Sequence, residues 1–246
     1  MKKFALTACV FVLCLACGFG LSACSIGEVK ENTSAVIETS TGIIPVEYSK
    51  GLATNLLQAA LTNLNSISYS YTIETRNLIG GAFQDVENPG ANGTYTFIND
   101  FGNNEMYADF SNFGKSVMKV LKNADNQAKY YDINIDTKKY RVMSGEIGNS
   151  TFSGLLNCVT DGMCYNGISY INCCQDNGSE QKDYYQVQIK DGLIQSIMYT
   201  DRDADSMRIT SQSTCNFSYE NIERPMYLPD TVEGLERLGY QLVANN

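Results

Sequence analysis

The pattern of hydrophobic and polar residues predicts one helix near the start of the folded region. Between Ser49 and Asn65, apolar residues recur at four-residue spacing, at Leu52, Leu56, Ala60 and Leu64, with Leu57 and Leu61 beside them. This spacing places them on one face of a helix and turns that face toward a core. Pro45 and Ser49 act as start signals for the helix, and Asn63 and Asn65 act as stop signals.

After Asn65 the period changes to two, which predicts half-buried strands. The alternation is clearest in the segment that contains Ile67, Tyr69, Tyr71 and Ile73. Similar short runs, separated by Asn, Asp, Gly or Lys, predict an antiparallel meander at 94–97, 105–110, 117–121, 130–136, 140–143, 168–173, 184–190, 193–200, 207–210 and 215–219. Asp191-Gly192 lies between two of these runs and predicts a tight type I′ hairpin.

Two segments depart from the strand pattern. Residues 149–167 contain a predicted short helix near Phe152–Cys158, and we interpret residues 149–174 as a cysteine-bearing insert. Residues Thr231–Leu238 predict a short terminal helix. No linker divides the chain after residue 44, so we expect a single domain over residues 45–246. The expected fold class is α+β, with one N-terminal helix packed on a strongly curved antiparallel sheet, or half-barrel.

The amino terminus predicts export and a lipid anchor. Lys2 and Lys3 precede an uncharged run from Phe4 to Gly27, which is the pattern of a secretory signal. The run contains Leu21-Ser22-Ala23-Cys24, which resembles a bacterial lipobox. The resemblance implies cleavage before Cys24, diacylglycerol on its thiol and often acylation of the new amino group. Residues 1–23 would then be a lipoprotein signal peptide, and residues 24–44 a flexible tether.

Two other interpretations of this segment stay open. Ala16-Cys17-Gly18 could be an ordinary cleavage site that releases a secreted protein. The uncharged run is also long enough to be an uncleaved membrane anchor. All three interpretations place the folded part outside the cytoplasm, attached to the outer face of the cell membrane or to the envelope if the lipid anchor is present.

Composition and charge exclude several functions. The chain has 246 residues, a formal net charge of −9 and no histidine. The absence of histidine excludes Ser-His-Asp and Cys-His catalysis and histidine-ligated metals. Loss of residues 1–23 removes two lysines and no acids, which changes the net charge to −11. This acidic balance argues against a nucleic-acid partner.

Five cysteines remain after Cys24, and in an exported protein they are candidates for disulfides: Cys158, Cys164, Cys173, Cys174 and Cys215. The sequence does not choose among the pairings. The cysteines lack paired C-x-x-C spacing, so we expect no metal site there. Asp201, Asp203 and Asp205 resemble the start of a calcium loop. However, Ser206 and Gln212 stand where such a loop needs glycine and glutamate, so we expect an acidic turn.

The strand tyrosines fit either a cavity wall for an amphiphile or an ordinary half-exposed sheet, and the second interpretation is favoured. They are Tyr69, Tyr71, Tyr95, Tyr131, Tyr170, Tyr185 and Tyr219.

The order of elements resembles the LolA/LolB/LppX-like lipoproteins over residues 45–230. Two stretches carry this likeness: the hairpin 189–194, and the ending from Phe217-Ser218-Tyr219 to Leu228-Pro229. The resemblance implies a curved sheet that encloses an apolar cavity and a role in carrying a lipid or lipoprotein-like ligand. The alternative is a surface protein-interaction or envelope-assembly module without a cavity. We expect neither catalysis nor a cofactor.

Overall fold

A computed structural model describes most of the chain after the amino-terminal segment. Its described residues are 45–85, 92–100, 103–110, 114–143, 150–176, 182–202 and 209–243. The expected signal peptide, Cys24 and the tether lie outside this part of the chain, as do Asp203, Asp205 and Ser206.

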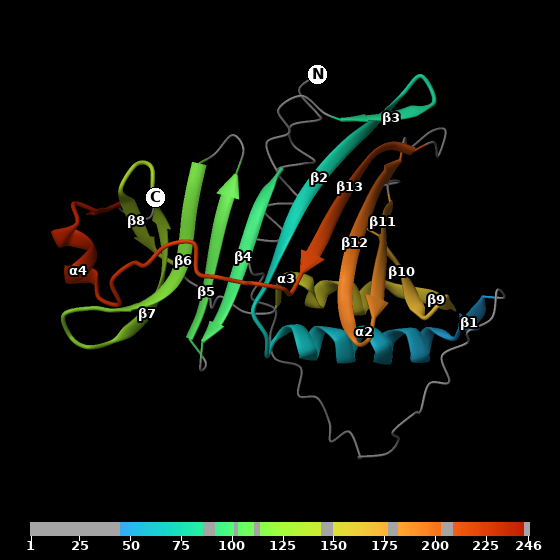
Figure 1. The fold of residues 1–246 in the computed structure, drawn as a ribbon, viewed down its shortest axis with the longest axis horizontal. Coiled ribbons are helices and arrows are strands. Elements are labelled where there is room, and N and C mark those ends of the chain that lie inside the picture. Colours follow the sequence, from blue (N-terminus) through green and yellow to red (C-terminus); the bar gives the residue numbers. More distant parts are fainter. Residues whose placement is uncertain are drawn as a thin grey trace, which may run out of the picture.

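The described strands form a single sheet, which is curled but not closed (Figure 1). Its order is β1-β9-β10-β11-β12-β13-β2-β4-β5-β6-β7-β8-β14, with β3 paired to β2. Neighbours are antiparallel except β14, which is parallel to β8. The strands are β1 (Val46–Tyr48), β2 (Tyr69–Ile79), β3 (Ala82–Asp85), β4 (Gly93–Asp100), β5 (Asn103–Phe110), β6 (Gly114–Lys122), β7 (Ala128–Asn134), β8 (Lys139–Val142), β9 (Val159–Tyr165), β10 (Ile168–Asp176), β11 (Lys182–Lys190), β12 (Leu193–Arg202), β13 (Ile209–Ser218) and β14 (Gln241–Leu242).

The expected α+β class is wrong, because the protein is mostly β. Its helical elements are α2 (Lys50–Leu64), α3 (Ser150–Ser153), the 3₁₀ helix η1 (Gly154–Cys158) and α4 (Val232–Arg237). Only α2 has more than two turns among the described elements, so the helices form no separate layer. The prediction that residues 149–174 form an insert is also wrong, because β9 and β10 are ordinary members of the sheet.

Helix α2 forms where the sequence predicts it. The Ser49 hydroxyl caps it by accepting a hydrogen bond from the Leu52 amide at 3.3 Å, and Asn65 ends it. The buried face is centred one residue away from the predicted stripe, on Ala53, Leu57, Ala60, Leu61 and Leu64. The predicted hairpin is also present, since Asp191 and Gly192 both have positive φ (52° and 75°) between β11 and β12.

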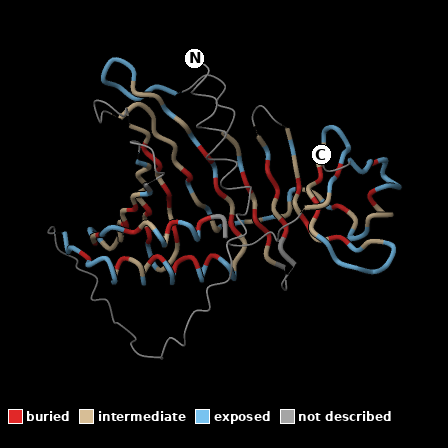
Figure 2. Tube along the Cα trace, turned by 180° about the vertical axis from the view of Figure 1, so that it is seen from behind, coloured by how far each residue is buried: buried red, intermediate tan, exposed pale blue. Residues whose placement is uncertain are grey.

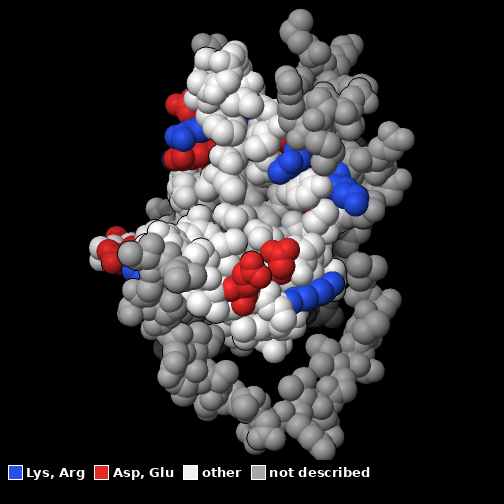
Figure 3. All heavy atoms as spheres, turned by 90° about the vertical axis from the view of Figure 1, so that its right-hand side faces the viewer, with Lys and Arg blue, Asp and Glu red and all other residues white. Residues whose placement is uncertain are grey.

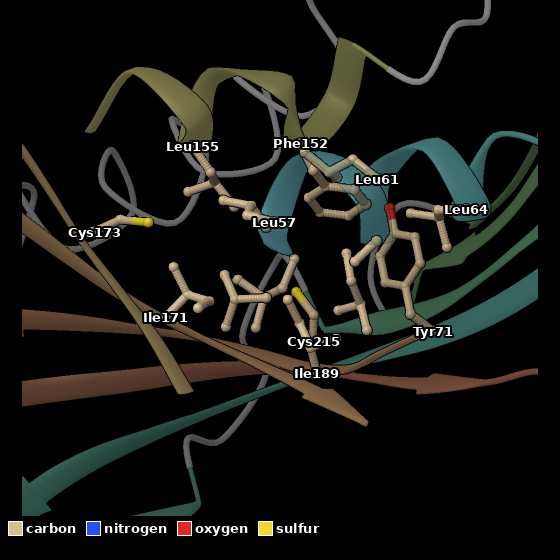
Figure 4. Close-up of a cluster of buried hydrophobic side chains, with 14 of the residues drawn as sticks. Leu57, Leu61, Leu64, Tyr71, Phe152, Leu155, Ile171, Cys173, Ile189 and Cys215 are labelled. Atoms are coloured by element: carbon tan, nitrogen blue, oxygen red, sulfur yellow. The ribbon is translucent and has the colours of Figure 1, made fainter. Parts of the chain in front are cut away.

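The sheet has two cores, one on each face (Figure 2). The first lies between α2, the α3–η1 segment and residues of β2, β4, β5 and β9–β13 (Figure 4). The second lies over β4–β8, where Ile98, Tyr107, Val117, Leu121 and Ile133 pack against the carboxy-terminal part of the chain. Strands β4 and β5 contribute to both cores. The predicted terminal helix is α4, capped by Thr231, and its Leu235 is buried in the second core.

Candidate functional site

The two faces of strands β9–β13 differ sharply in polarity. Ile171, Val187, Ile197 and Cys215 are aligned across neighbouring strands and are buried in the first core, toward α2. Successive side chains of a strand point to opposite faces. The next row of aligned residues, Asn172, Gln186, Met198 and Thr214, therefore lies on the face opposite α2.

An open cavity of about 560 Å³ lies over these strands. Among its described lining residues only Asp161 and Arg202 carry a formal charge, so these residues together have no net charge. The cavity is lined by Thr160, Asp161, Asn172, Cys173, Cys174, Tyr184, Tyr185, Gln186, Met198, Thr200, Arg202, Ile209 and Gln212.

Hydrogen bonds fix the polar side chains at the β9–β11 side of the cavity. The Asn172 amide nitrogen donates to Asp161 Oδ1 at 2.6 Å, and the Gln186 amide nitrogen donates to Asn172 Oδ1 at 3.2 Å. The Thr160 hydroxyl donates to the Asn172 backbone carbonyl at 3.1 Å. A chain of amides and one carboxylate therefore offers donors and acceptors in a fixed arrangement.

The other side of the cavity combines aromatic and aliphatic surface with a guanidinium and an amide group. The guanidinium of Arg202 lies over the Tyr184 ring, 4.7 Å from its centre. The Gln212 amide nitrogen contacts the Met198 sulfur at 2.7 Å, and Thr200 is buried beside them. Apolar surface from Met198, Ile209 and the Tyr184 ring thus adjoins the hydrogen-bonding groups.

The region under α2, where the sequence predicted an apolar cavity, is filled by side chains. Leu57, Phe152 and Leu155 meet Ile171, Ile189 and Cys215 there (Figure 4). Three of the strand tyrosines, Tyr69, Tyr71 and Tyr95, belong to this core. Tyr71 and Tyr95 stack at 4.7 Å and 8°, and burial raises the pKa of Tyr71 well above 10. These rings fill a core and do not line an open site.

Burial of the remaining strand tyrosines varies. Tyr131 lies in the second core, Tyr185 packs at the edge of the first core, and the Tyr219 hydroxyl donates to the Ile194 carbonyl at 2.6 Å. Tyr170 is half-buried and lies in β10 opposite Gln188.

A buried ionic cluster holds the carboxy-terminal part of the chain against β5 and β6. Lys119 lies 3.1 Å from Glu105 and 2.8 Å from Asp230, and it also donates to the Leu228 carbonyl at 3.2 Å. Arg224 lies 2.9 Å from Glu105. Residues 219–231, which we call the C-terminal strap, supply Arg224, Leu228 and Asp230. Glu105, Asp230 and the Leu228 carbonyl together occupy all three N–H donors of Lys119. This arrangement indicates a structural role, in which the ammonium group holds the C-terminal strap against β5 and β6.

Electrostatics around Glu105 favour its charged form. Burial would raise the pKa of this carboxyl group, but the hydrogen bond from Tyr107 and the neighbouring Lys119 and Arg224 lower it overall. The Tyr107 oxygen lies 2.5 Å from Glu105 Oε2 and 3.1 Å from the Met226 carbonyl. The strap is therefore held by both ion pairs and hydrogen bonds.

All five candidate cysteines are free thiols in the structure. Cys173 and Cys174 point to opposite faces of β10 as neighbours in a strand do, Cys173 into the core and Cys174 beside the cavity. Cys164 and Cys215 are buried, and Cys158 is half-buried at the end of η1.

No group of three or more metal-ligating side chains occurs among the described residues. Asp201, the described member of the acidic triplet, lies in β12 opposite Ser211 of β13. The side of the molecule that carries β1 shows small groups of charged side chains, in which acidic and basic residues adjoin, with uncharged surface between the groups (Figure 3). No helix in the described ranges is long and apolar enough to cross a membrane.

Sequence reasoning missed the cavity residues Asn172, Gln186 and Gln212. No motif marks them, and polar residues are the expected content of an exposed strand face. The available signal was that Asn172 and Gln186 are amides in two strands of the predicted meander, and that the amide Gln212 lies between two other predicted strands. Recognising a cavity from this signal requires the strand register, which the sequence does not provide.

Comparison with protein families and with curated proteins gives no match. Twelve chains of solved structures show a likeness. One is a DUF1329 family protein from Desulfovibrio piger, with 12% identity and a TM-score of 0.29, covering 78% of this chain and 97% of that one. Another is MucB, solved in complex with MucA(peri), with 9% identity and a TM-score of 0.32, covering 72% of this chain and 65% of that one. Scores this low establish neither fold nor function.

Proposed function

We propose that this protein is an exported, lipid-anchored binding module whose cavity over β9–β13 recognises an uncharged oligosaccharide. The observation that carries the proposal is the neutral, hydrogen-bonding lining of the cavity over β9–β13. A neutral lining gives no Coulombic advantage to a charged ligand, so selection depends on hydrogen bonds and shape.

Sugar chemistry matches both parts of the lining. Each sugar hydroxyl donates and accepts hydrogen bonds, as the amides of Asn172 and Gln186 do. The C–H faces of a sugar ring pack on apolar and aromatic surface, which Met198, Ile209 and Tyr184 offer. A lipid chain would offer no partner to the donor and acceptor positions of Asn172 and Gln186 that remain beyond their existing hydrogen bonds, and each buried, unpaired polar group costs about 1–3 kcal/mol.

The lipid-carrier interpretation finds less support in the packing. An apolar ligand under α2 would have to displace Leu57, Phe152 and Leu155 from the first core. If no sugar binds, the alternative is a protein-interaction module of the envelope. A pull-down with envelope proteins separates it from the sugar-binding proposal.

Binding without catalysis is part of the proposal. Most glycoside hydrolases use two carboxyl groups on either side of the bond that breaks. Asp161 is the single carboxylate among the described residues of the cavity lining. We therefore expect incubation with oligosaccharides to leave them intact, as judged by mass spectrometry.

Calorimetric titration of the mature protein with chitotetraose, cellotetraose and maltotetraose tests the site. At least one of these should bind, and Asn172→Ala or Gln186→Ala should weaken binding about 5- to 10-fold through the lost hydrogen bonds. The control is Gln175→Ala, an exposed residue of β10 outside the lining, and it should leave affinity unchanged. Absence of binding at millimolar sugar, or equal effects of Asn172→Ala and Gln175→Ala, would overturn the proposal.

The anchor is tested separately. Cys24→Ser should move the protein from the membrane fraction to a soluble or unprocessed form, because serine lacks the thiol that carries the lipid. Unchanged membrane association together with normal processing of the Cys24→Ser protein would contradict lipidation at this residue.

A further inference from the structure

The positions of the five described cysteines leave few candidate disulfide pairs. Cys215 is fully buried in the middle of the sheet, aligned with Ile197 and Ile73. Cys164 lies in β9, where it contacts the Tyr48 side chain. Cys174 lies on the opposite face from Cys173, so these adjacent residues point apart.

Cys158 and Cys173 lie together. Cys158 is the last residue of η1, and the next residue, Val159, is paired with Cys173 between β9 and β10. The register shifts at a bulge beside Cys173, and both cysteines pack in the first core. Each thiol shifts the pKa of the other, and the Cys158 thiol also donates to the Leu155 carbonyl at 3.3 Å within its own turn. Cys173 is located at the edge of the core beside the α3–η1 segment (Figure 4).

The two thiols are suited to different roles in an exchange reaction. The hydrogen bond from Cys173 lowers the pKa of Cys158, which is partly accessible. The same contact, together with burial, raises the pKa of Cys173. Cys158 is therefore the thiol that ionises first and attacks an external disulfide.

We propose that Cys158 and Cys173 form a disulfide after export, which fastens η1 to β10. The oxidant is the disulfide of an exported thiol oxidoreductase. The Cys158 thiolate attacks one of its sulfurs, which forms a mixed disulfide and releases one oxidant thiolate. Cys173 then loses its proton to solvent and attacks the Cys158 sulfur, which releases the second oxidant thiolate. The protein loses two electrons and two protons, and the oxidant gains two thiols.

The bond would secure one wall of the proposed binding site. Cys173 borders the cavity, and its neighbours Asn172 and Cys174 contribute to the lining. The η1 residue Leu155 is buried against the first core on the other face of the sheet. Fixing η1 to β10 therefore limits movement of the strand that supplies Asn172.

The pairing rests on the export included in the proposed function. It is tested by isolating the protein from an exporting host under alkylating conditions and mapping its peptides without reduction. We expect a linked peptide pair that contains Cys158 and Cys173, with Cys164, Cys174 and Cys215 alkylated. Alkylation of both Cys158 and Cys173, or a linked pair that contains another cysteine, would overturn the proposal.

A thermal test distinguishes failure of the pairing from failure of export. Reduced protein is oxidised in vitro with glutathione disulfide and melted with and without dithiothreitol. Wild type and the control Cys174→Ser should lose about 6–12 °C in Tm on reduction, and Cys158→Ser should show no such loss. An equal response of Cys158→Ser would contradict the pairing. If Cys158 and Cys173 pair in vitro but remain free thiols in cells, the disulfide after export is refuted. The geometry of the pair would then be correct and the assumption of export wrong.

Discussion

Lys119→Met should destabilise the protein far more than the same change at Lys115. Both lysines lie in β6 and pair with carboxylates of β5, but their surroundings differ. The side chains of Lys119 and Glu105 are 4% and 8% exposed, whereas those of Lys115 and Asp109 are 60% and 58% exposed. The two variants therefore differ in the burial of the ion pair and in the contacts that Lys119 makes with the C-terminal strap.

The expected magnitude follows from what Lys119→Met leaves behind. Removing one partner of a buried ion pair typically costs about 3–5 kcal/mol, because the remaining charge is uncompensated. Glu105 keeps Arg224 at 2.9 Å and Tyr107 at 2.5 Å, so we expect about 3 kcal/mol. This corresponds to a Tm about 6–12 °C lower for a domain of this size. Lys115→Met should cost at most about 1 kcal/mol.

Urea unfolding followed by circular dichroism measures both variants. The double variant Glu105→Gln/Lys119→Met should be more stable than the sum of its single changes predicts, because it removes both buried charges. A free energy of unfolding for Lys119→Met within about 1 kcal/mol of that for Lys115→Met would refute the idea that the cluster fastens the strap.

Further predictions concern single groups. The Tyr71 hydroxyl is buried without a partner in the described structure, so Tyr71→Phe should leave stability unchanged or raise it, whereas Tyr219→Phe should cost about 1 kcal/mol in urea unfolding. Because the pKa of Glu105 is lower in the folded protein than the ordinary glutamate value of 4.5, its charged form stabilises the fold above pH 4.5. This contribution should be lost as the pH falls below 4.5 and through the lowered pKa, and the measured Tm should fall with it. Gly192→Ala should lower the free energy of unfolding by about 1 kcal/mol, because the φ of this residue is +75°. Gly154→Ala is the control, since a Cβ there meets open space, and an equal loss of stability in both variants would contradict the turn assignment.

Local signals explain which parts of the fold the sequence could predict. Helix α2 carries its own start at Ser49 and its own apolar stripe, and the hairpin at Asp191-Gly192 depends on two residues that tolerate positive φ. These features depend on neighbours within a few positions. The strand alternation around Tyr69 and Tyr71 is equally local, so the existence of the strands was predictable.

Long-range pairings explain what the sequence could not predict. The placement of β13 beside β2 and of β1 beside β9 joins residues far apart in the chain, and no local pattern encodes it. The meeting of Glu105, Lys119 and Arg224 depends on the same long-range order. The predicted fold class was wrong because one clear helix was given more weight than the much longer part of the chain that was predicted to form strands.

The position of β13 has a consequence for folding. Strands β2 and β4–β8 can pair in the order of their synthesis, and so can β9–β13, but the two groups join at a single boundary between β2 and β13. That boundary cannot form until residue 218 is available. Contacts of such large sequence separation slow folding, because loop closure precedes the gain in contacts. A chain that must cross a membrane before it folds would benefit from this delay, since neither half of the sheet is complete without the other.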